Sequence, residues 1–293
     1  MDFLQHLING VYIGAIYAII ALGYTMVYGI AKMLNFAHGD VIMVGAFMSY
    51  TVTSAYGVPV VPSILIAMVI CTLLGILIEG LAYKPLRGAS SLAVLITAIG
   101  VSYFLQNAAQ LIWGPAEIAF KQVVTMDPLV LFGGKLKISA EVLVTMVVAV
   151  LIMVGLTAFV NKTKMGKAMR AVSEDREAAQ LMGINVNRTI STTFAIGSAL
   201  AAVAGVLLCS KVQAVWPTVG SMPGIRAFTA AVFGGIGSIP GAMLGGMLLG
   251  LIETFGGAYI STQFSDAIVF LVLILILLVK PAGLLGKQVQ EKV

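Results

Sequence analysis

The sequence predicts an all-α fold class: a polytopic membrane helical bundle with eight or nine transmembrane segments, some of them broken or re-entrant. Three observations lead to this prediction. Of the 293 residues, 60% are apolar and only 10% are charged, whereas soluble domains carry about 25% charged residues. The mean hydropathy is +1.05. The apolar residues also form long uninterrupted runs, and a run of about 20 such residues spans the hydrocarbon core of a bilayer.

Nine apolar runs are the expected spans. They lie at about 8–30, 41–56, 63–82, 92–112, 141–160, 191–210, 220–236, 242–260 and 267–279. The second and seventh runs are short, and they are rich in Gly or flanked by Gly and Pro. Either could therefore be a half-helix that re-enters the membrane, which leaves the count at eight or nine. The first run has no cleavage site after it, so we expect an uncleaved first span.

The composition also excludes several classes of protein. A soluble enzyme, a nucleic-acid-binding protein and a secreted disulfide scaffold would not carry nine apolar runs. The net charge of +5 fits loops beside anionic lipid, so we expect membrane lipid, and not nucleic acid, as a partner. Cys71 and Cys209 both lie inside apolar runs, which argues against a disulfide framework.

The basic residues predict the orientation of the chain, because they concentrate on the cytoplasmic side of a membrane. The longest charged segment, 161–190, carries six Lys or Arg residues and is expected inside. This choice also places Lys32, Lys84, Arg87 and the C-terminal lysines inside. The N-terminus and the long loop 113–140 then lie outside.

Small residues spaced four apart predict close helix packing. They are Gly10/Gly14, Ala201/Gly205, Gly241/Gly245 and Gly246/Gly250. Such pairs allow helix backbones to approach one another inside a membrane, where lipid provides no hydrophobic drive for association. They indicate a compact bundle and carry no information about a transported substrate.

No catalytic or metal-binding pattern is present in the sequence. Its two histidines, His6 and His38, lack neighbours at metal-ligand spacing, and a metal site normally needs three or four ligands. The nearest approach to a phosphate-binding loop, at 166–168, lacks both the leading glycine and the hydroxyl residue. We therefore expect a chain that does not hydrolyse ATP by itself.

Residues 173–183 of the charged loop predict one short helix. Ser173 is a candidate N-cap, and Gly183 can adopt the left-handed conformation that ends helices. Ala178, Leu181 and Met182 then form a small apolar stripe flanked by charged residues. On the residues alone, two interpretations stay open: the helix lies on the lipid surface, or it docks to a cytoplasmic partner.

Four stretches of the chain resemble one known family. Residues 177–183 (EAAQLMG) match the E-A-A-x-x-x-G loop of ABC importer permeases, although the hydrophobic, proline-containing tail that often follows that loop is absent. Residues 24–40 (YTMVYGI followed by LNFAHGD), 165–171 (MGKAMRA) and 227–242 (AFTAAVFGGIGSIPGA) extend the match along nearly the whole chain. Together they resemble the LivH-type permeases of the branched-chain amino acid ABC transporters.

This resemblance implies that residues 1–293 form a single permease domain of an ABC importer, with its cytoplasmic coupling loop at 161–190. The chain would be a multi-pass subunit that forms half of the translocation path for branched-chain or related amino acids, in the inner membrane of a bacterium or archaeon. The implied partners are a second LivM-like permease subunit, two cytoplasmic ATP-binding subunits and an extracytoplasmic substrate-binding protein. The chain would bind no cofactor and would not be an enzyme, because ATP and Mg would be used by the partner ATPase subunits.

By the same resemblance, Glu177, Ala178, Ala179 and Gly183 belong to the loop that contacts the ATPase. With their neighbours, the candidate coupling residues are Arg170, Asp175, Glu177, Ala178, Ala179, Leu181 and Gly183.

The candidate residues for the translocation path or its gate lie where spans end in polar or Gly-rich sequence. They are Asn35, His38, Asp40, Gly235, Gly237 and Glu253. The first three predict either a bend that lines the path or a helix end capped by Asp40 or Asn35. The two glycines predict either a broken helix near the path or tight packing.

Glu253 lies in the middle of an apolar run, where a charge costs about 3 kcal/mol. We expect it to form a polar link to a neighbouring span, in preference to a proton relay, because a single carboxylate makes a poor relay. The alternative function, an ion-coupled secondary amino-acid transporter, would need embedded carboxylates and usually two internal repeats. Only Glu253 offers the former, and no clear inverted repeat is visible.

Overall fold

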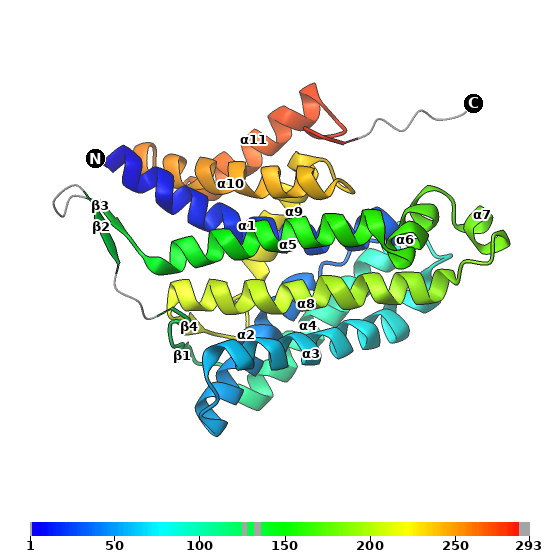
Figure 1. The fold of residues 1–293 in the computed structure, drawn as a ribbon, viewed down its shortest axis with the longest axis horizontal. Helices are drawn as coiled ribbons and strands as arrows, with labels where there is room; N and C mark the ends of the chain where they lie inside the picture. Colours follow the sequence, from blue (N-terminus) through cyan, green and yellow to red (C-terminus); the bar gives the residue numbers. More distant parts are fainter. Residues whose placement is uncertain (1, 125–127, 132–135, 287–293) are drawn as a thin grey trace. The chain divides into compact units, whose positions relative to one another are not determined.

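The structure is a computed structural model that describes residues 2–124, 128–131 and 136–286. Within these ranges the chain is mainly helical, with four short strands (Figure 1). The helices are α1 (Asp2–Ala31), α2 (His38–Tyr56), α3 (Val60–Ile78), α4 (Ser91–Trp113), α5 (Ala140–Lys162), α6 (Lys164–Glu174), α7 (Arg176–Leu181), α8 (Val186–Val212), α9 (Ser221–Gly234), α10 (Ile239–Tyr259) and α11 (Ser265–Val279). The π-helical turn η1 (Glu79–Tyr83) and the 3₁₀ turn η2 (Lys84–Leu86) follow α3.

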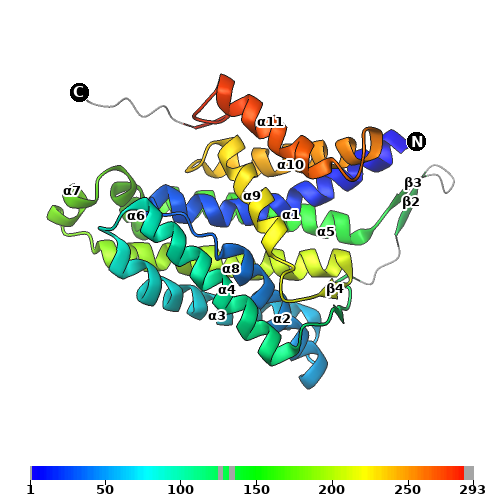
Figure 2. The same cartoon turned by 180° about the vertical axis from the view of Figure 1, so that it is seen from behind.

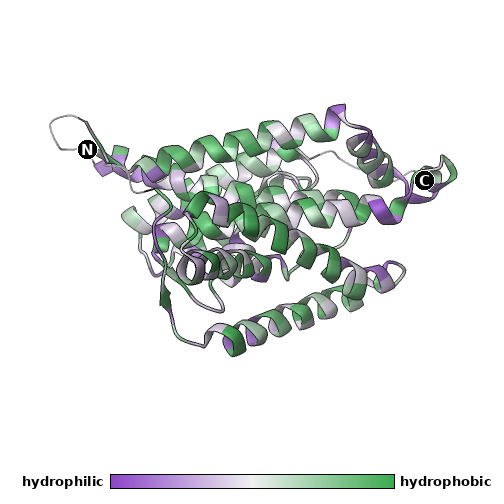
Figure 3. Ribbon diagram, turned by 60° about the horizontal axis from the view of Figure 1, so that its bottom comes forward, coloured by the Kyte–Doolittle hydropathy of each residue, from purple (hydrophilic) through white to green (hydrophobic). Residues whose placement is uncertain are grey.

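Every predicted span coincides with a helix, which confirms an all-α polytopic membrane protein. Six helical segments in the described residues are long and apolar enough to cross a bilayer. They are Asp2–Ala31, Val60–Leu86, Ser91–Trp113, Ala140–Lys162, Val186–Val212 and Ile239–Tyr259. Hydrophobic residues occupy much of the length of the long helices (Figure 3). The predicted count of eight or nine is not confirmed, because α9 and α11 have only 14 and 15 residues and α2 does not meet the same criteria.

The chain divides into two compact units. Unit 1 comprises residues 1–25, 124–153 and 226–293, and unit 2 comprises residues 26–123 and 154–225.

In unit 2, α8 packs against both α2 and α3 (Figures 1 and 2). Glycines make this packing close. A Cβ atom on Gly45 of α2 would lie 2.5 Å from the Cα atom of Ala202, and one on Gly205 of α8 would collide with the carbonyl oxygen of Ile42. One on Gly75 of α3 would collide with the side chain of Ser198. Gly205, one member of the predicted Ala201/Gly205 pair, is thus confirmed as a position of backbone contact.

In unit 1, α10 packs against α1 and α9 through the other predicted glycine pairs. A Cβ atom on Gly14 would lie 2.8 Å from the Cα atom of Met247, and one on Gly246 would lie 2.5 Å from that of Ala18. A Cβ atom on Gly245 would collide with the carbonyl oxygen of Ala230 in α9. Helix α11 follows α10 and contacts it.

The strands belong to loops that the sequence analysis placed outside the membrane. In unit 2, β1 (Ile118–Ala119) pairs antiparallel with β4 (Ala214–Val215), with Ile118 opposite Val215. In unit 1, β2 (Leu129–Leu131) and β3 (Leu136–Ile138) form an antiparallel pair. The sequence analysis did not predict any of these strands, since each has only two or three residues.

Candidate functional site

The candidate coupling loop folds as two helices, α6 and α7, and α7 projects from its unit at one end (Figures 1 and 2). The prediction of a single helix that begins at Ser173 is wrong. Ser173 lies inside α6, where its hydroxyl donates to the carbonyl oxygen of Arg170 at 2.7 Å. The chain breaks at Asp175, which has extended backbone angles. Its carboxylate accepts hydrogen bonds from the amides of Glu177 and Ala178 at 2.9 and 3.0 Å, and a carboxylate is a strong N-cap.

The other end of α7 has the predicted glycine termination. Gly183 has a φ of +82°. Its amide donates to the carbonyl oxygen of Gln180, and the amide of Ile184 donates to that of Ala179, each at 3.0 Å. These two bonds form the Schellman pattern that closes a helix C-terminus. The position of α7 on the chain is therefore fixed by caps at both ends.

The predicted apolar stripe of α7 is exposed. Leu181 is 89% exposed and Met182 is 83% exposed, and Ala178 is also exposed. Ala179, by contrast, is buried and anchors the helix to the rest of the unit. Among the remaining coupling candidates, Glu177 is exposed, and the exposed side chain of Arg170 reaches Asn161 at 3.5 Å.

The predicted bend at Asn35, His38 and Asp40 is buried inside unit 2. The three residues are exposed by only 4%, 1% and 2%. The side-chain Oδ1 atom of Asn35 accepts a hydrogen bond from the Tyr83 hydroxyl at 2.9 Å. Ala37 occupies the N-cap position of α2 and makes no side-chain capping bond, whereas the carboxylate of Asp40 contacts its own backbone amide in the first turn of the helix, so the alternative of a capped helix end stays a prediction. Residues 32–37 form an irregular connection between α1 and α2, and its role in a path or gate stays a prediction.

Asp40 belongs to a small polar cluster in unit 2. Gln106 of α4 donates a hydrogen bond from its Nε2 atom to the carboxylate of Asp40 at 2.9 Å. The same nitrogen lies 3.2 Å from the hydroxyl of Ser102 and 3.3 Å from that of Ser221. The sequence analysis did not connect Gln106 with Asp40, since 66 residues separate them.

Gly235 and Gly237 lie in unit 1, in the turn between α9 and α10. Their φ angles are +103° and +98°, so the chain is broken there and side chains would be strained. The C-terminal segment packs on this turn, because the amides of Leu284 and Leu285 donate to the carbonyl oxygens of Phe233 and Gly234, each at 2.9 Å. The helix break and the tight packing are therefore both present, and a position of these glycines near the translocation path stays a prediction.

Glu253 of α10 makes the expected polar link to a neighbouring helix. Its carboxylate pairs with Arg226 of α9 at 2.6 Å. Arg226 also pairs with Asp266 of α11 at 2.5 Å and donates to the hydroxyl of Tyr17 of α1 at 2.9 Å. The sequence analysis missed Arg226, although an arginine inside an apolar run is itself a signal that an acidic partner is close.

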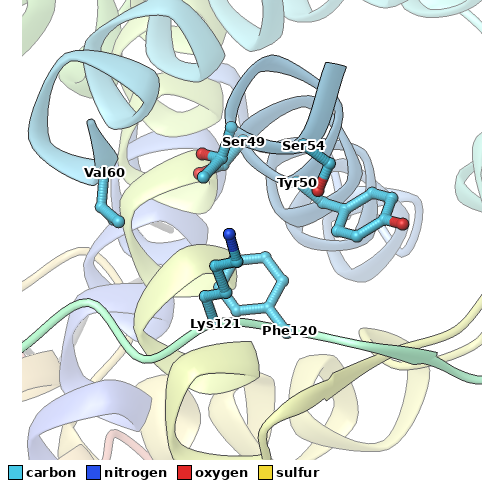
Figure 4. A pocket seen from close by; sticks show the side chains of 7 residues that line it. Ser49, Tyr50, Ser54, Val60, Phe120 and Lys121 are labelled. Carbon is cyan, nitrogen blue, oxygen red and sulfur yellow. The ribbon is translucent and has the colours of Figure 1, made fainter. Parts of the chain in front are cut away.

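A small pocket, partly open to solvent, lies in unit 2 between the end of α2, the start of α3 and the loop after β1 (Figure 4). Its lining combines hydroxyl groups with one cation and two apolar side chains. The lining residues are Ser49, Tyr50, Thr53, Ser54, Val60, Phe120 and Lys121. No signal in the sequence brings residues 49–60 together with residues 120 and 121.

Comparison with known proteins finds one matching family and several similar proteins. Residues 6–277 match the family described as "Branched-chain amino acid transport system / permease component". The chain is 46% identical to the high-affinity branched-chain amino acid transport system permease protein BraD of Pseudomonas aeruginosa, over 99% of this chain and 98% of that protein. It is also 46% identical to the permease protein LivH of Escherichia coli K12, with the same coverage. A probable branched-chain amino acid transport permease of Methanocaldococcus jannaschii is 32% identical over 92% of this chain and 88% of that protein.

Proposed function

The chain belongs to the family of branched-chain amino acid transport permease components, and we propose that it forms half of the translocation path of an ABC importer for branched-chain or related amino acids. It is a multi-pass membrane protein and its relatives are transport components, not enzymes. In the proposed complex it pairs with a second LivM-like permease in the inner membrane of a bacterium or archaeon. Two cytoplasmic subunits bind and hydrolyse ATP with Mg, and an extracytoplasmic binding protein delivers the amino acid.

The exposed apolar stripe of α7 is the observation that carries this proposal. A six-residue helix is too short to be stable on its own, yet its two caps and the buried Ala179 hold it folded. Two large apolar side chains, Leu181 and Met182, nevertheless face outward. Exposed apolar groups held in a fixed shape are typical of a surface that a partner covers. The basic segment around α7 predicts the cytoplasmic side, where the ATP-binding subunits lie.

In this mechanism the chain receives mechanical work and performs no chemistry. ATP binding closes the two ATPase subunits, which move the docked α7 and the helices attached to it. The bundle then opens its path on one side or the other. Because selectivity can reside in the binding protein, the path itself needs no tight site for the amino acid.

The first test changes α7 in the complete transporter. We expect Leu181→Asp to prevent co-purification of the ATP-binding subunits, because a carboxylate would be buried in an apolar interface, which costs several kcal/mol. We expect Glu177→Lys and Gly183→Asp to leave the chain in the membrane and to abolish the coupling of ATP hydrolysis to leucine uptake in proteoliposomes. Gln180→Asp is the matched control, since it adds the same charge to an exposed position of the same helix and leaves the stripe intact.

Two results would contradict the proposal. If Leu181→Asp binds the ATPase subunits normally, the stripe lies on lipid and is not a docking surface. If the purified chain alone concentrates leucine inside vesicles, it does not depend on a separate ATPase at all.

A further inference from the structure

The connection between α1 and α2, residues 32–37, is held between two groups of polar contacts within unit 2. Helix α1 ends at the fully buried Ala31, and Lys32 takes a left-handed φ of +51°. The last four carbonyl oxygens of a helix lack partners inside the helix. The carbonyl of Ala31 therefore needs an external donor in a place that water does not reach.

Arg176 provides this donor. It is the first residue of the docking helix α7, and its guanidinium donates a hydrogen bond to the carbonyl oxygen of Ala31, although 145 residues separate the two. Among the described residues, Arg176 takes part in none of the salt bridges. Burial, and then the positive charge of Arg87, lower the pKa of Arg176. The negative end of the α1 dipole compensates its charge.

A second group of contacts reaches the same connection from the start of α8. The buried carboxylate of Glu79 pairs with Arg87 and accepts a hydrogen bond from the Ser191 hydroxyl at 2.5 Å. Arg87 also donates to the side chain of Asn187. Glu79 begins the π-helical turn η1, and Tyr83 ends it.

Tyr83 links this second group of contacts to the α1–α2 connection. Its hydroxyl donates to Asn35 at 2.9 Å, and its ring packs on Phe194 of α8 with centroids 5.2 Å apart. Both Tyr83 and Asn35 are buried, so the bond between them is shielded from competing water. The start of α8 follows directly after α7 in the chain, and it therefore shares any displacement of α7.

We propose that Arg176 is a positioning residue that ties α7 to the α1–α2 connection, with Tyr83 as a second tie from the start of α8. The inference rests on the proposed docking of α7 to an ATPase. Displacement of α7 then pulls on Ala31 directly, and displacement of the start of α8 pulls on Asn35 through Glu79, Arg87 and Tyr83. The α1–α2 connection transmits both movements to the start of α2.

The start of α2 is packed closely enough to pass the movement on. A Cβ atom on Gly39 would lie 2.6 Å from the carbonyl oxygen of Gly220, just before α9. Asp40 is bound to Gln106, which also reaches Ser221. Close-packed contacts of this kind transmit strain, because they leave no free space in which a displacement could be absorbed. A shift at residues 32–37 therefore moves the first turns of α2 and α9 together.

The test compares variants in the fully assembled transporter. We expect Arg176→Ala to keep the ATPase subunits bound and to lower the number of leucine molecules imported per ATP by roughly tenfold, the factor for one charge-assisted hydrogen bond. We expect Tyr83→Phe to lower this ratio by a smaller factor, since it removes a neutral bond. Arg176→Lys keeps a donor of similar reach and should restore most of the ratio. Arg188→Ala removes the same charge from an exposed position of the same segment and should leave the ratio unchanged.

A fluorescent label separates transmission from simple loss of structure. Lys32→Cys and Gln180→Cys place a label on the α1–α2 connection and on α7, since both positions are exposed and the native Cys71 and Cys209 are buried. On addition of ATP we expect both labels to change signal in the otherwise unchanged chain. In Arg176→Ala we expect the label at position 180 to respond fully and the label at position 32 to respond more weakly, because only the Tyr83 tie to Asn35 remains.

Each outcome decides between the alternatives. If the label at position 32 responds equally in Arg176→Ala, or if that variant imports at the normal ratio, the tie does not transmit movement while the docking of α7 still stands. If the label at position 180 does not respond even with Arg176 present, α7 does not move with the ATPase. The proposed docking and the tie that depends on it then both fail.

Discussion

Each unit contains an arginine that pairs with acidic side chains, and the two clusters differ in their charge balance. In unit 2, Arg87 pairs with the single carboxylate of Glu79, which Ser191 also contacts, and the positive charge of Arg87 also acts on Arg176. In unit 1, the single Arg226 lies between the carboxylates of Glu253 and Asp266. The first cluster thus has an excess of positive charge, and the second has an excess of negative charge.

This difference follows the predicted orientation of the chain. The segment around Arg87 is predicted to be cytoplasmic, where basic residues gather. Asp266 lies between the last two predicted spans, on the side predicted to be external. The two clusters also connect different elements of secondary structure. The Arg87 cluster connects the turns after α3 with the start of α8, whereas Arg226 connects three helices, α9, α10 and α11, and also reaches α1 through Tyr17. Among the described residues, Arg226 alone links these helices of unit 1 by ion pairs, whereas the contacts around Arg87 in unit 2 also include the neutral side chains of Asn187 and Ser191.

The largest expected effect comes from Arg226→Ala. Two carboxylates would remain in a largely apolar environment without their cation, and breaking a buried ion pair in this way costs about 3–5 kcal/mol. Because Asp266 is 38% exposed, we expect a loss near the lower end of that range, measured as a fall in the Tm of the purified chain in detergent. Arg188→Ala, at an exposed position, is the control. If both variants lower the Tm equally, Arg226 does not hold unit 1 together.

A smaller effect is expected for Arg87→Ala. Glu79 would lose its ion pair but keep the hydrogen bond from Ser191 at 2.5 Å, so we expect a loss of about 1–2 kcal/mol in the free energy of unfolding. The second change Glu79→Gln should recover part of this loss, because it removes the buried charge that Arg87 had compensated. The comparison between the units would be wrong if Arg87→Ala lowered the Tm more than Arg226→Ala.

The smallest effect is expected for Glu253→Gln. Asp266 continues to pair with Arg226, and the glutamine amide oxygen can still accept a hydrogen bond, so we expect a loss below about 1 kcal/mol. Leucine uptake by the reconstituted complex should remain dependent on ATP. An ion-coupled transporter that used Glu253 as its relay would instead lose uptake together with its ion dependence. Uptake in proteoliposomes with and without ATP distinguishes the two.

Apolar runs and glycine spacing were sufficient to predict where the helices lie and how several of them touch. All the predicted spans are helices, and Gly14, Gly205, Gly245 and Gly246 are positions of close backbone contact, as expected. The physical reason is that span length and small-residue spacing are local properties of the sequence. The break at Asp175 was missed because Ser173 is also a residue type that caps helices, and only the folded chain shows that Asp175 accepts the amide hydrogens.

The candidate site was predicted in part. The exposed stripe of α7 was predicted from its spacing, because a helix of known period places its side chains on known faces. The partners of buried polar residues were not predicted: Asn35 contacts Tyr83, Asp40 contacts Gln106, and Arg176 contacts Ala31. These contacts join residues far apart in the chain, and hydropathy does not indicate which faces of two helices meet.

The double capping of α7 has a consequence for how the transporter assembles. Asp175 and Gly183 hold the helix in shape before any partner arrives, so association needs little ordering of the backbone. A segment that folded only on contact would lose part of its binding free energy to that ordering, and collisions would succeed less often. In the proposed complex, a preformed α7 should therefore allow rapid recruitment of the ATPase subunits, so that the lifetime of that complex is set by how slowly Leu181 and Met182 dissociate from it.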